Sequence, residues 1–211
     1  MQKAKSKFIV IEGGEGSGKS SLISYAKEYF GNRIIVSREP GGSEYAEIIR
    51  EVALKNPLAK QAEPETMMCL MFAARYDHIK NTIKPALKKG KTVISDRFDG
   101  SSYAYNVWAQ SKGRLDKFFW TARNVMDIKP DIYIFIDVDT KEGLIRARAR
   151  NKNNSDGNHF DDREVTFHKK VKSGYVKFLS RVHHVTVDAN RPLEEVKKSF
   201  VETLEKIFNS K

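Results

Sequence analysis

The chain has 211 residues, 40% of them hydrophobic, which is enough to bury a sizeable core in one domain spanning 1–211. Its net charge of +11 predicts an anionic partner, and nucleic acid, an anionic membrane and a nucleotide are all compatible. The apolar runs are too short to span a bilayer, and the lone Cys69 excludes an internal disulfide framework. Since the basic segment 1–7 is followed by Glu12 and a glycine cluster, we expect no signal peptide and a cytoplasmic protein.

Short β-rich runs alternate with helical stretches along the whole chain. The predicted strands are 8–11, 33–37, 92–96, 131–138 and 183–188. The predicted helices are 20–30, 43–54, 65–89, 100–110, 114–126, 140–150, 165–179 and 193–208. Pro85 should end or kink the helix 65–89, and the polar stretch 151–158 is predicted to be a surface loop. This alternation predicts an α/β fold with a five-stranded parallel sheet and helices on both faces.

The glycine-rich segment 13–20, with the sequence GGEGSGKS, fits the pattern G-x-x-x-x-G-K-[ST] at every constrained position. It follows an apolar strand and opens a helix, so backbone N–H groups and the helix dipole can converge on a polyphosphate. Lys19 would face the β- and γ-phosphates, and the Ser20 hydroxyl would bind Mg²⁺. The predicted ATP-binding residues here are Gly13, Gly14, Gly16, Ser17, Gly18, Lys19, Ser20 and Ser21. A chance glycine turn would not require Lys19 and Ser20 in this register.

Two arginines follow the second and third predicted strands. Arg38 opens the segment R-E-P-G-G, and Arg97 lies in D-R-F, each beyond the carboxyl end of a strand, where open α/β sheets bind ligands. Such planar, permanently charged side chains can hold a phosphorylated acceptor in line with ATP, although either alone is compatible with an ordinary surface arginine. Asp96, which ends its strand, is a candidate Mg²⁺ ligand, the alternative being a helix N-cap.

These segments together resemble the thymidylate kinase family in its bacterial and phage style, from Phe8 to about Pro192. The resemblance implies a P-loop nucleoside monophosphate kinase fold with a lid, and transfer of the ATP γ-phosphoryl group to dTMP. It assigns Arg38 and Arg97 to the acceptor's phosphate and Glu15 to the 3′-hydroxyl of its deoxyribose. In the stretch S-S-Y-A-Y-N, it assigns Ser101 to the sugar and base pocket, and it assigns Tyr105 to the exclusion of ribose, with simple packing as the alternative for the tyrosine.

The base pocket departs from the family pattern at two positions. By the resemblance, Arg75 bonds the carbonyl edge of the pyrimidine, and Met71, four residues earlier, shares its helix face. The family usually has an aromatic residue at that position, so either Met71 packs on the base or a local bulge brings Phe72 to it. Asn106 stands where the family has glutamine. Modified pyrimidines, dUMP or another deoxynucleotide are therefore alternative acceptors.

A basic helix end precedes the loop, and the resemblance predicts a lid over about 146–162. Arg150 is the first candidate for the cation that stabilises the transferring group and Arg146 the second; a solvated basic helix end is the alternative. The family's D-R-x-E motif corresponds to 158–161, where its arginine is missing, and Arg163 or Lys152 could replace it. Asn190 lies in a segment that resembles the loop meeting the adenine of ATP.

The predicted chemistry is direct in-line transfer, which needs no covalent intermediate and no strong general base, because a phosphate oxygen is already ionised. The rival hypotheses are a nucleic-acid-binding protein, supported by charge and by Trp108 and Trp120, and a GTPase, for which no N-K-x-D motif is found. We expect ATP and a deoxynucleoside monophosphate as partners, with neither nucleic acid nor membrane. The resemblance also predicts a homodimer, with 67–72 and 118–125 as candidate contacts.

Overall fold

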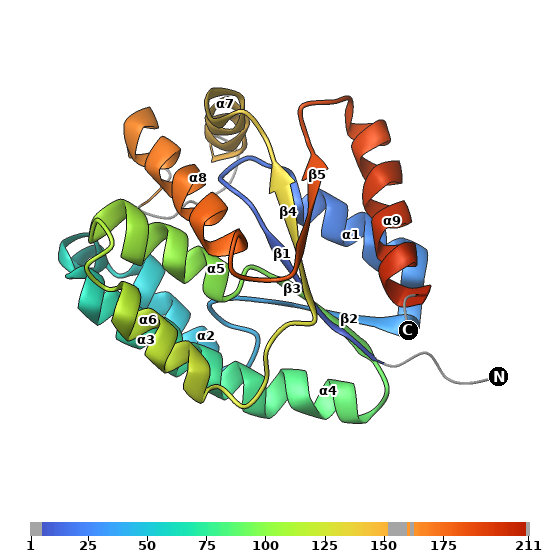
Figure 1. Ribbon diagram of the computed structural model, residues 1–211, viewed down its shortest axis with the longest axis horizontal. Coiled ribbons are helices and arrows are strands. Elements are labelled where there is room, and N and C mark those ends of the chain that lie inside the picture. Colours follow the sequence, from blue (N-terminus) through green and yellow to red (C-terminus); the bar gives the residue numbers. More distant parts are fainter. Residues whose placement is uncertain (1–5, 152–159, 161–162, 210–211) are drawn as a thin grey trace.

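The computed structural model describes residues 6–151, 160 and 163–209, and its centre is a parallel β-sheet (Figure 1). The strands are β1 (Phe8–Glu12), β2 (Ile34–Arg38), β3 (Thr92–Asp96), β4 (Ile132–Asp137) and β5 (His184–Asp188). They lie in the order β2-β3-β1-β4-β5, and every neighbouring pair is parallel. The predicted α/β fold with a five-stranded parallel sheet is confirmed.

Strand β1 is the central strand, and all five of its residues are buried. Successive side chains of a strand point to opposite faces of the sheet. Phe8 and Val10 accordingly pack in one hydrophobic cluster, whereas Ile9 and Ile11 pack in the other. A continuous apolar run is what a strand covered on both faces requires.

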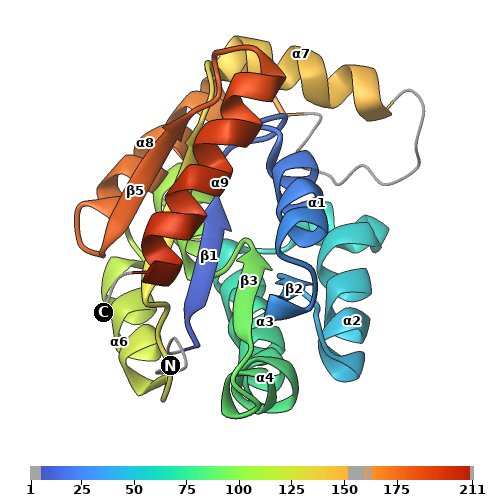
Figure 2. The same cartoon turned by 90° about the vertical axis from the view of Figure 1, so that its right-hand side faces the viewer.

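Helices cover both faces of the sheet (Figures 1 and 2). Helices α1 (Lys19–Phe30) and α9 (Leu193–Asn209) share one cluster with Ile9 and Ile11. The helices on the Phe8 and Val10 side include α3 (Pro64–His78), α4 (Lys84–Lys88), α6 (Asp116–Val125) and α8 (Val165–Leu179). The remaining α-helices are α2 (Glu44–Arg50), α5 (Asp99–Ser102) and α7 (Thr140–Asn151).

Several predicted helices contain π-helical turns. Pro85 does interrupt the long helix: a π-helical turn, Ile79–Ile83, separates α3 from α4, because proline has no N–H group to donate to the preceding turn. The predicted helix 100–110 consists of α5 followed by the π-helical segment Tyr103–Gln110. Beyond α2 lie a π-helical turn, Glu51–Lys55, and a 3₁₀ helix, Pro57–Gln61, that was not predicted.

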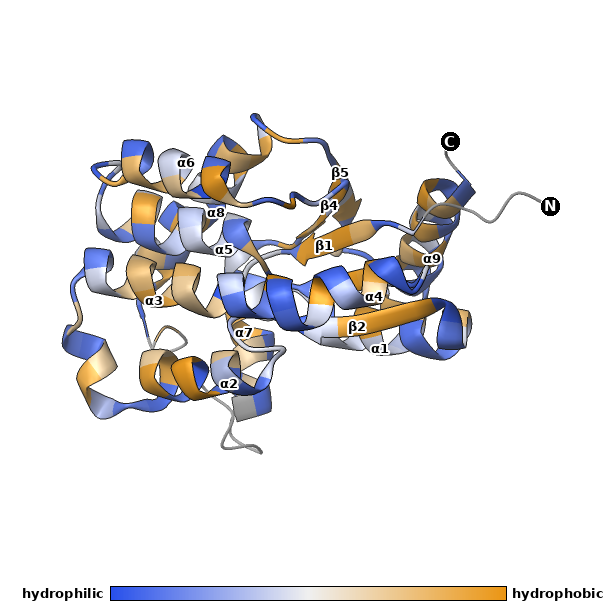
Figure 3. Ribbon diagram, turned by 90° about the horizontal axis from the view of Figure 1, so that it is seen from below, coloured by the Kyte–Doolittle hydropathy of each residue, from blue (hydrophilic) through white to orange (hydrophobic). Residues whose placement is uncertain are grey.

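The strand register brings the motif-bearing ends of β1, β2 and β3 together. Asp96 pairs with Ile11 of β1 on one side and with Arg38 of β2 on the other. The loops that follow these strands therefore leave the sheet at one edge, which is where the site lies. In Figure 3 the hydrophobic colour runs along β1 and β2, whereas the helices are mixed. Among the described residues, no helix is long and apolar enough to cross a membrane.

Candidate active site

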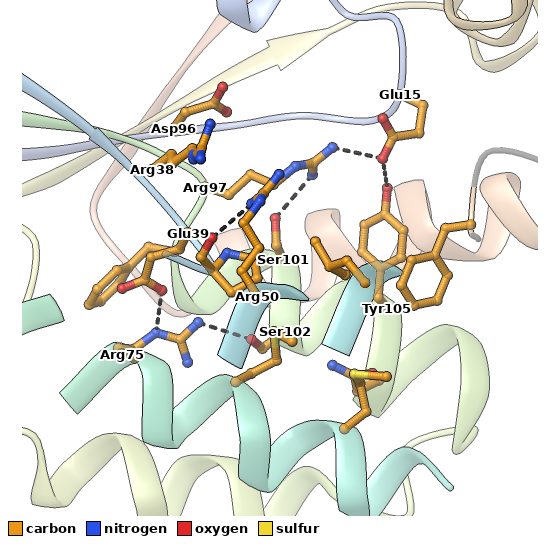
Figure 4. A pocket seen from close by; sticks show the side chains of 17 residues that line it. Glu15, Arg38, Glu39, Arg50, Arg75, Asp96, Arg97, Ser101, Ser102 and Tyr105 are labelled. Carbon is orange, nitrogen blue, oxygen red and sulfur yellow. Dashed lines mark hydrogen bonds and ion pairs between the residues drawn. The ribbon is translucent and has the colours of Figure 1, made fainter. Parts of the chain in front are cut away.

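One cavity lies at this edge of the sheet, and the predicted acceptor-binding residues gather in it (Figure 4). The predicted residues that line it are Glu15, Arg38, Met71, Arg75, Asp96, Arg97, Ser101, Tyr105 and Asn106. The lining residues that sequence reasoning missed are Glu39, Pro40, Arg50, Leu54, Met67, Phe98, Ser102 and Phe160. The cavity thus has a charged end near Asp96 and an apolar end near the methionines.

The glycine-rich loop wraps around the amino group of Lys19. The Nζ atom donates to the carbonyl oxygens of Gly13 and Gly14, both at 2.9 Å, and to Ser17 Oγ at 3.2 Å. Gly18, at φ 86°, turns the chain so that α1 begins at Lys19 with its free N–H groups facing the loop. Burial, together with repulsion from Arg97, lowers the pKa of Lys19 to about 8, against the attraction of Asp96 and Glu15. Ser20 and Ser21 are exposed at the start of α1.

Helix α7 packs directly against the tip of this loop. Gly16, at φ 67°, meets Gly143 so closely that an added Cβ would lie 1.8 Å from the Gly143 carbonyl oxygen. An added Cβ on Gly143 would in turn lie 2.5 Å from the carbonyl oxygen of Glu15. Glycine at both positions lets the first turn of α7 touch the phosphate-binding loop. Gly143 was not predicted, because a glycine within a helix carries no signal of such a contact.

Arg97 is held in one orientation by its backbone and by its partners. It has a φ of 64°, which is unusual for any residue except glycine, and its N–H donates to the Ile11 carbonyl at 2.9 Å. Its Nη1 atom donates to the Gly13 carbonyl oxygen, to Ser101 Oγ and to the hydroxyl of Tyr175. The guanidinium therefore connects the phosphate-binding loop with α5 and α8. Tyr175 had no sequence signal beyond its helical position.

Glu15 pairs with Arg97 and with Tyr105 through the same carboxylate oxygen. Its Oε1 atom accepts from Arg97 Nη2 and from the Tyr105 hydroxyl, both at 2.8 Å. Burial opposes ionisation of Glu15, but Arg97, Lys19 and the Tyr105 hydroxyl outweigh it and lower its pKa to about 2. Since the folded-state pKa is depressed, the stabilisation is present above pH 4.5 and is lost as the pH falls toward 2. Glu15 is thus a carboxylate at neutral pH.

The charged end of the cavity contains Arg38 and Arg50 beside Asp96. Arg38 is more exposed than Arg97 and donates to Glu47 Oε2 at 3.0 Å. Arg50 of α2, which was not predicted, donates to the Pro40 carbonyl oxygen at 2.7 Å. Burial, followed by repulsion from Arg38, lowers the pKa of Arg50. Asp96 Oδ1 is buried and has no hydrogen-bond partner in the described part of the chain. This end can receive an anion or a hydrated cation.

The apolar end shows which residue of helix α3 faces the cavity. Since α3 is regular from Pro64 to His78, Met71 shares a face with Arg75, and both line the cavity. Phe72 is displaced by about 100° around the helix and packs in the core instead, 5.9 Å from the ring of Phe119. Of the two residues predicted to contact the acceptor's base, Met71 lines the cavity and Phe72 does not, because no bulge reorients the helix there. Its ring lies 5.1 Å from Arg75 Cζ.

Arg75 is buried and retains an unused donor. Its Nε donates to Glu39 Oε2 at 2.8 Å and its Nη2 to Ser102 Oγ at 3.0 Å. Within residues 6–151, 160 and 163–209, its Nη1 has no hydrogen-bond partner. Nearby, Asn106 lines the cavity and accepts from Gln110 Nε2 with its amide oxygen, which leaves its amide nitrogen as the donor that can serve another partner. This part of the wall presents hydrogen-bond donors.

Ser101 has a structural partner as well as its place in the cavity wall. Its hydroxyl donates to Glu12 Oε2 at 2.7 Å, and its N–H donates to Glu12 Oε1 at 3.0 Å. The N–H of Phe98 donates to the same carboxylate at 3.0 Å. Burial raises the pKa of Glu12 against these hydrogen bonds. Glu12 thus fixes the turn after Asp96 from beneath.

The lid is described only at its beginning and near its end. Arg146 pairs with Glu142 and donates to the Ala189 carbonyl oxygen at 3.4 Å, whereas Arg150 is exposed at the end of α7. Asn190 accepts from the Asp139 N–H at 2.8 Å, so the predicted adenine loop is joined to the end of β4. Lys152 and most of the predicted lid lie outside the described residues, and Arg163 stacks on Phe167 at 5.4 Å.

Comparison with known proteins agrees with this geometry. The model of a family described as thymidylate kinase matches residues 11–200. A thymidylate kinase of Lactobacillus helveticus is 36% identical over 210 residues, covering 94% of this chain and 95% of the relative. Those of Oceanobacillus iheyensis and Francisella philomiragia are 35% and 33% identical, covering 97% and 96% of this chain and 92% and 100% of the relatives. The chain belongs to the thymidylate kinase family.

Proposed function

We propose that the protein transfers the γ-phosphoryl group of ATP to dTMP, giving dTDP and ADP, in the pathway that supplies dTTP. The observation that carries this proposal is a cavity lined by Glu15 of the phosphate-binding loop, by the strand-end arginines Arg38 and Arg97, and by Arg75, whose Nη1 has no hydrogen-bond partner among the described residues. Membership of the family supports it independently. Relatives named thymidylate kinase match this chain over 95% and 100% of their own length.

At the phosphate end, catalysis would come from positioning and from cations. Lys19 would leave its carbonyl partners and pair with the β- and γ-phosphates, while Arg38 and Arg97 would hold the acceptor's phosphate in line. Arg150 or Arg146 would approach the transferring group from the lid helix. An acceptor phosphate oxygen is already ionised at neutral pH, so no side chain need remove a proton. The close contact of Gly16 with Gly143 would bring the lid helix beside the reacting groups.

The residues present fit a magnesium ion. Asp96 Oδ1 is buried without a hydrogen-bond partner among the described residues, and Ser20 opens α1 next to the loop. Within the described ranges, no three His, Cys, Asp or Glu side chains cluster as a complete metal site. Mg²⁺ commonly binds through one or two protein oxygens together with water and nucleotide phosphates. Bound there, the ion would neutralise charge on the phosphates, with Asp96 and Ser20 as its protein ligands.

At the other end, the donors would select a base by its carbonyl groups. Arg75 Nη1 has no hydrogen-bond partner among the described residues, and the amide nitrogen of Asn106 is a second donor in the wall. Thymine and uracil would supply a carbonyl acceptor on the edge where cytosine carries an amino group. Met71, Met67 and Leu54 supply the apolar surface against which a pyrimidine can pack. Modified deoxyuridylates present the same carbonyl edge, so they are the alternative acceptors.

Replacing Tyr105 by alanine is expected to improve the use of ribonucleotides. The Tyr105 ring is 6% exposed, packs 5.1 Å from Phe160, and would crowd a 2′-hydroxyl on a sugar held by Glu15. The ratio of kcat/KM for UMP to that for dUMP should rise about tenfold in Y105A, since an excluded hydroxyl is admitted. The ratio is unaffected by partial unfolding of the variant.

The matched control for this prediction is Tyr105→Phe. It keeps the ring and removes only the hydroxyl that donates to Glu15. Y105F should lower overall activity while leaving the UMP to dUMP ratio near that of the wild type. An equal ratio in Y105A and the wild type would show that the ring does not exclude ribose.

The proposed reaction is tested by identifying its products. Purified protein incubated with Mg²⁺, ATP and dTMP should form dTDP and ADP in equal amounts, as separated by ion-exchange chromatography and mass spectrometry. ADP without a phosphorylated acceptor would contradict the proposal and indicate an ATPase. If neither product forms, a nucleic-acid-binding function becomes the leading alternative, and salt-dependent DNA binding would be measured next.

We also propose that the protein acts as a homodimer in the cytoplasm. Exposed apolar side chains on α2, on the π-helical turn that follows it, on α3 and on α6 support the dimer: Tyr45, Ile48, Val52, Tyr76, Phe118 and Val125. Much of the stretch 67–72 is unavailable for such a contact, because its methionines and Phe72 are buried within the subunit. Sedimentation equilibrium should give twice the mass of one chain, and the V125E variant should shift the protein toward monomer. A monomeric wild-type protein would contradict this proposal.

A further inference from the structure

Glu39 is a buried carboxylate that holds two side chains of helix α3 at once. Its Oε2 atom accepts from Arg75 Nε at 2.8 Å, and its Oε1 atom lies 2.9 Å from His78 Nδ1. The side chains of Glu39, Arg75 and His78 are no more than 3% exposed. A guanidinium buried this deeply requires a compensating charge, and Glu39 supplies it.

His78 is held on its other side by strand β2. Its Nε2 atom lies 2.6 Å from Ser37 Oγ, so both ring nitrogens have partners. The backbone of Gly42 covers this contact, because an added Cβ there would lie 2.4 Å from Ser37 Oγ and 2.5 Å from His78 Nε2. With Glu39 ionised, Nδ1–H donates to it while Nε2 accepts from the Ser37 hydroxyl. The imidazole is therefore fixed between the strand and the carboxylate.

This chain of contacts connects the two ends of the cavity. Arg38, at the charged end, lies between Ser37 and Glu39 in the sequence. Its own side chain pairs with Glu47 and not with Glu39. Arg75, at the apolar end, is anchored by Glu39 itself (Figure 4). Glu39, which directly follows Arg38 in the sequence, thus sets the orientation of Arg75 at the other end of the cavity.

We propose that Glu39 and His78 are positioning residues for base recognition, which fix Arg75 so that it distinguishes a carbonyl from an amino group on the pyrimidine. This inference rests on the proposed function. Neither residue needs to touch the base: His78 does not line the cavity, and Glu39 acts through Arg75. A guanidinium released from Glu39 can rotate away from its place in the wall, and its ability to reject cytosine is then lost.

Two nearly isosteric variants of His78 separate this role from simple packing. In H78N, the amide nitrogen replaces Nδ1 and can still donate to Glu39. In H78Q, the amide nitrogen replaces Nε2, so it can donate to Ser37 Oγ but leaves Glu39 without this partner. The measured quantity is the ratio of kcat/KM for dTMP to that for dCMP. We expect H78Q to lower this ratio about tenfold and to raise KM for dTMP, with KM for ATP within about twofold of the wild type.

Control variants separate the contact of His78 with Ser37 from its contact with Glu39. S37A removes the hydroxyl that faces Nε2 and should keep the wild-type ratio, and H78N should match S37A. If H78Q does not fold, E39D is the second variant, since its carboxylate is too short to reach Arg75 and His78 together and should lower the ratio in the same way.

The outcomes are distinguishable. An unchanged ratio in H78Q and E39D, or an equal loss in H78Q and H78N, would overturn the positioning role while the wild type still phosphorylates dTMP. A wild-type protein that phosphorylates no nucleoside monophosphate would instead overturn the proposed function, and this inference with it.

Discussion

Replacing Lys19 by methionine is expected to lower kcat by about a thousandfold, equivalent to about 4 kcal/mol of transition-state stabilisation. Lys19 Nζ lies within the glycine-rich loop, bonded to two carbonyl oxygens that a triphosphate would displace. Methionine has similar length and is tolerated in buried positions, so the loss would reflect the charge rather than a cavity. Steady-state rates at saturating ATP and dTMP measure the effect. A K19M enzyme within tenfold of the wild type would contradict this role.

The titration of Lys19 provides an independent check. Because burial lowers its pKa to about 8, the free enzyme carries the cation below that pH and loses it progressively above. The kcat/KM for ATP, which reports groups of the free enzyme, should therefore fall as the pH rises through about 8. K19R keeps its charge at every accessible pH, so its profile should lack this inflection. A wild-type profile that is flat to pH 10 would exclude Lys19 as the titrating group.

Replacing Arg97 by methionine is expected to lower kcat/KM for the acceptor by about a thousandfold. Arg97 connects Glu15, the Gly13 carbonyl oxygen, Ser101 and Tyr175, and it is the cation placed between the loop and the acceptor cavity. The kcat/KM for dTMP should fall far more than the affinity for ATP, measured by isothermal calorimetry. A loss shared equally by the two nucleotides would contradict the assignment to the acceptor.

The loss in R97M also has a stability component that must be separated from catalysis. Without Arg97, the buried Glu15 carboxylate loses its principal counter-charge, so the melting temperature should fall. The double variant E15Q/R97M removes the unpaired charge and should recover much of the melting temperature without recovering activity. Recovery of activity in the double variant would show that Arg97 acts only by neutralising Glu15.

The fold and the phosphate end of the site follow from local sequence. Runs of β-branched residues define the strands, and Lys19 and Ser20 must follow the last glycine of the loop to meet a phosphate at a helix N-terminus. Arg38 and Arg97 come together because β2 and β3 are neighbours with Arg38 opposite Asp96, and parallel strands end at one edge. The order of the strands itself was not predicted, since no local pattern specifies it.

The residues at the apolar end of the cavity could not all be predicted from the sequence, because their positions depend on tertiary structure. The choice between Met71 and Phe72 required knowing that α3 is regular there, because any local bulge between these residues and Arg75 would have changed which side chain faces the cavity. In the sequence, Arg50 is an ordinary charged position of a helix. In the structure it donates to the Pro40 carbonyl oxygen and lines the cavity. The contacts of Glu39 with Arg75 and His78 join segments nearly forty residues apart, so no spacing rule could have found them.

The selectivity of the wild-type enzyme among acceptors follows directly from the residues that line the base end of the cavity. Initial rates of ADP formation would be measured with Mg-ATP and a panel of dTMP, dUMP, 5-substituted dUMP, dCMP, dGMP, dAMP and UMP. The donors of Arg75 and Asn106 and the ring of Tyr105 predict that dTMP and its 5-substituted relatives give the highest kcat/KM, with dCMP and UMP at least about a hundredfold lower. A preference for dCMP or a purine nucleotide would contradict the reading of the base pocket, and turnover of none of them would contradict the proposed function.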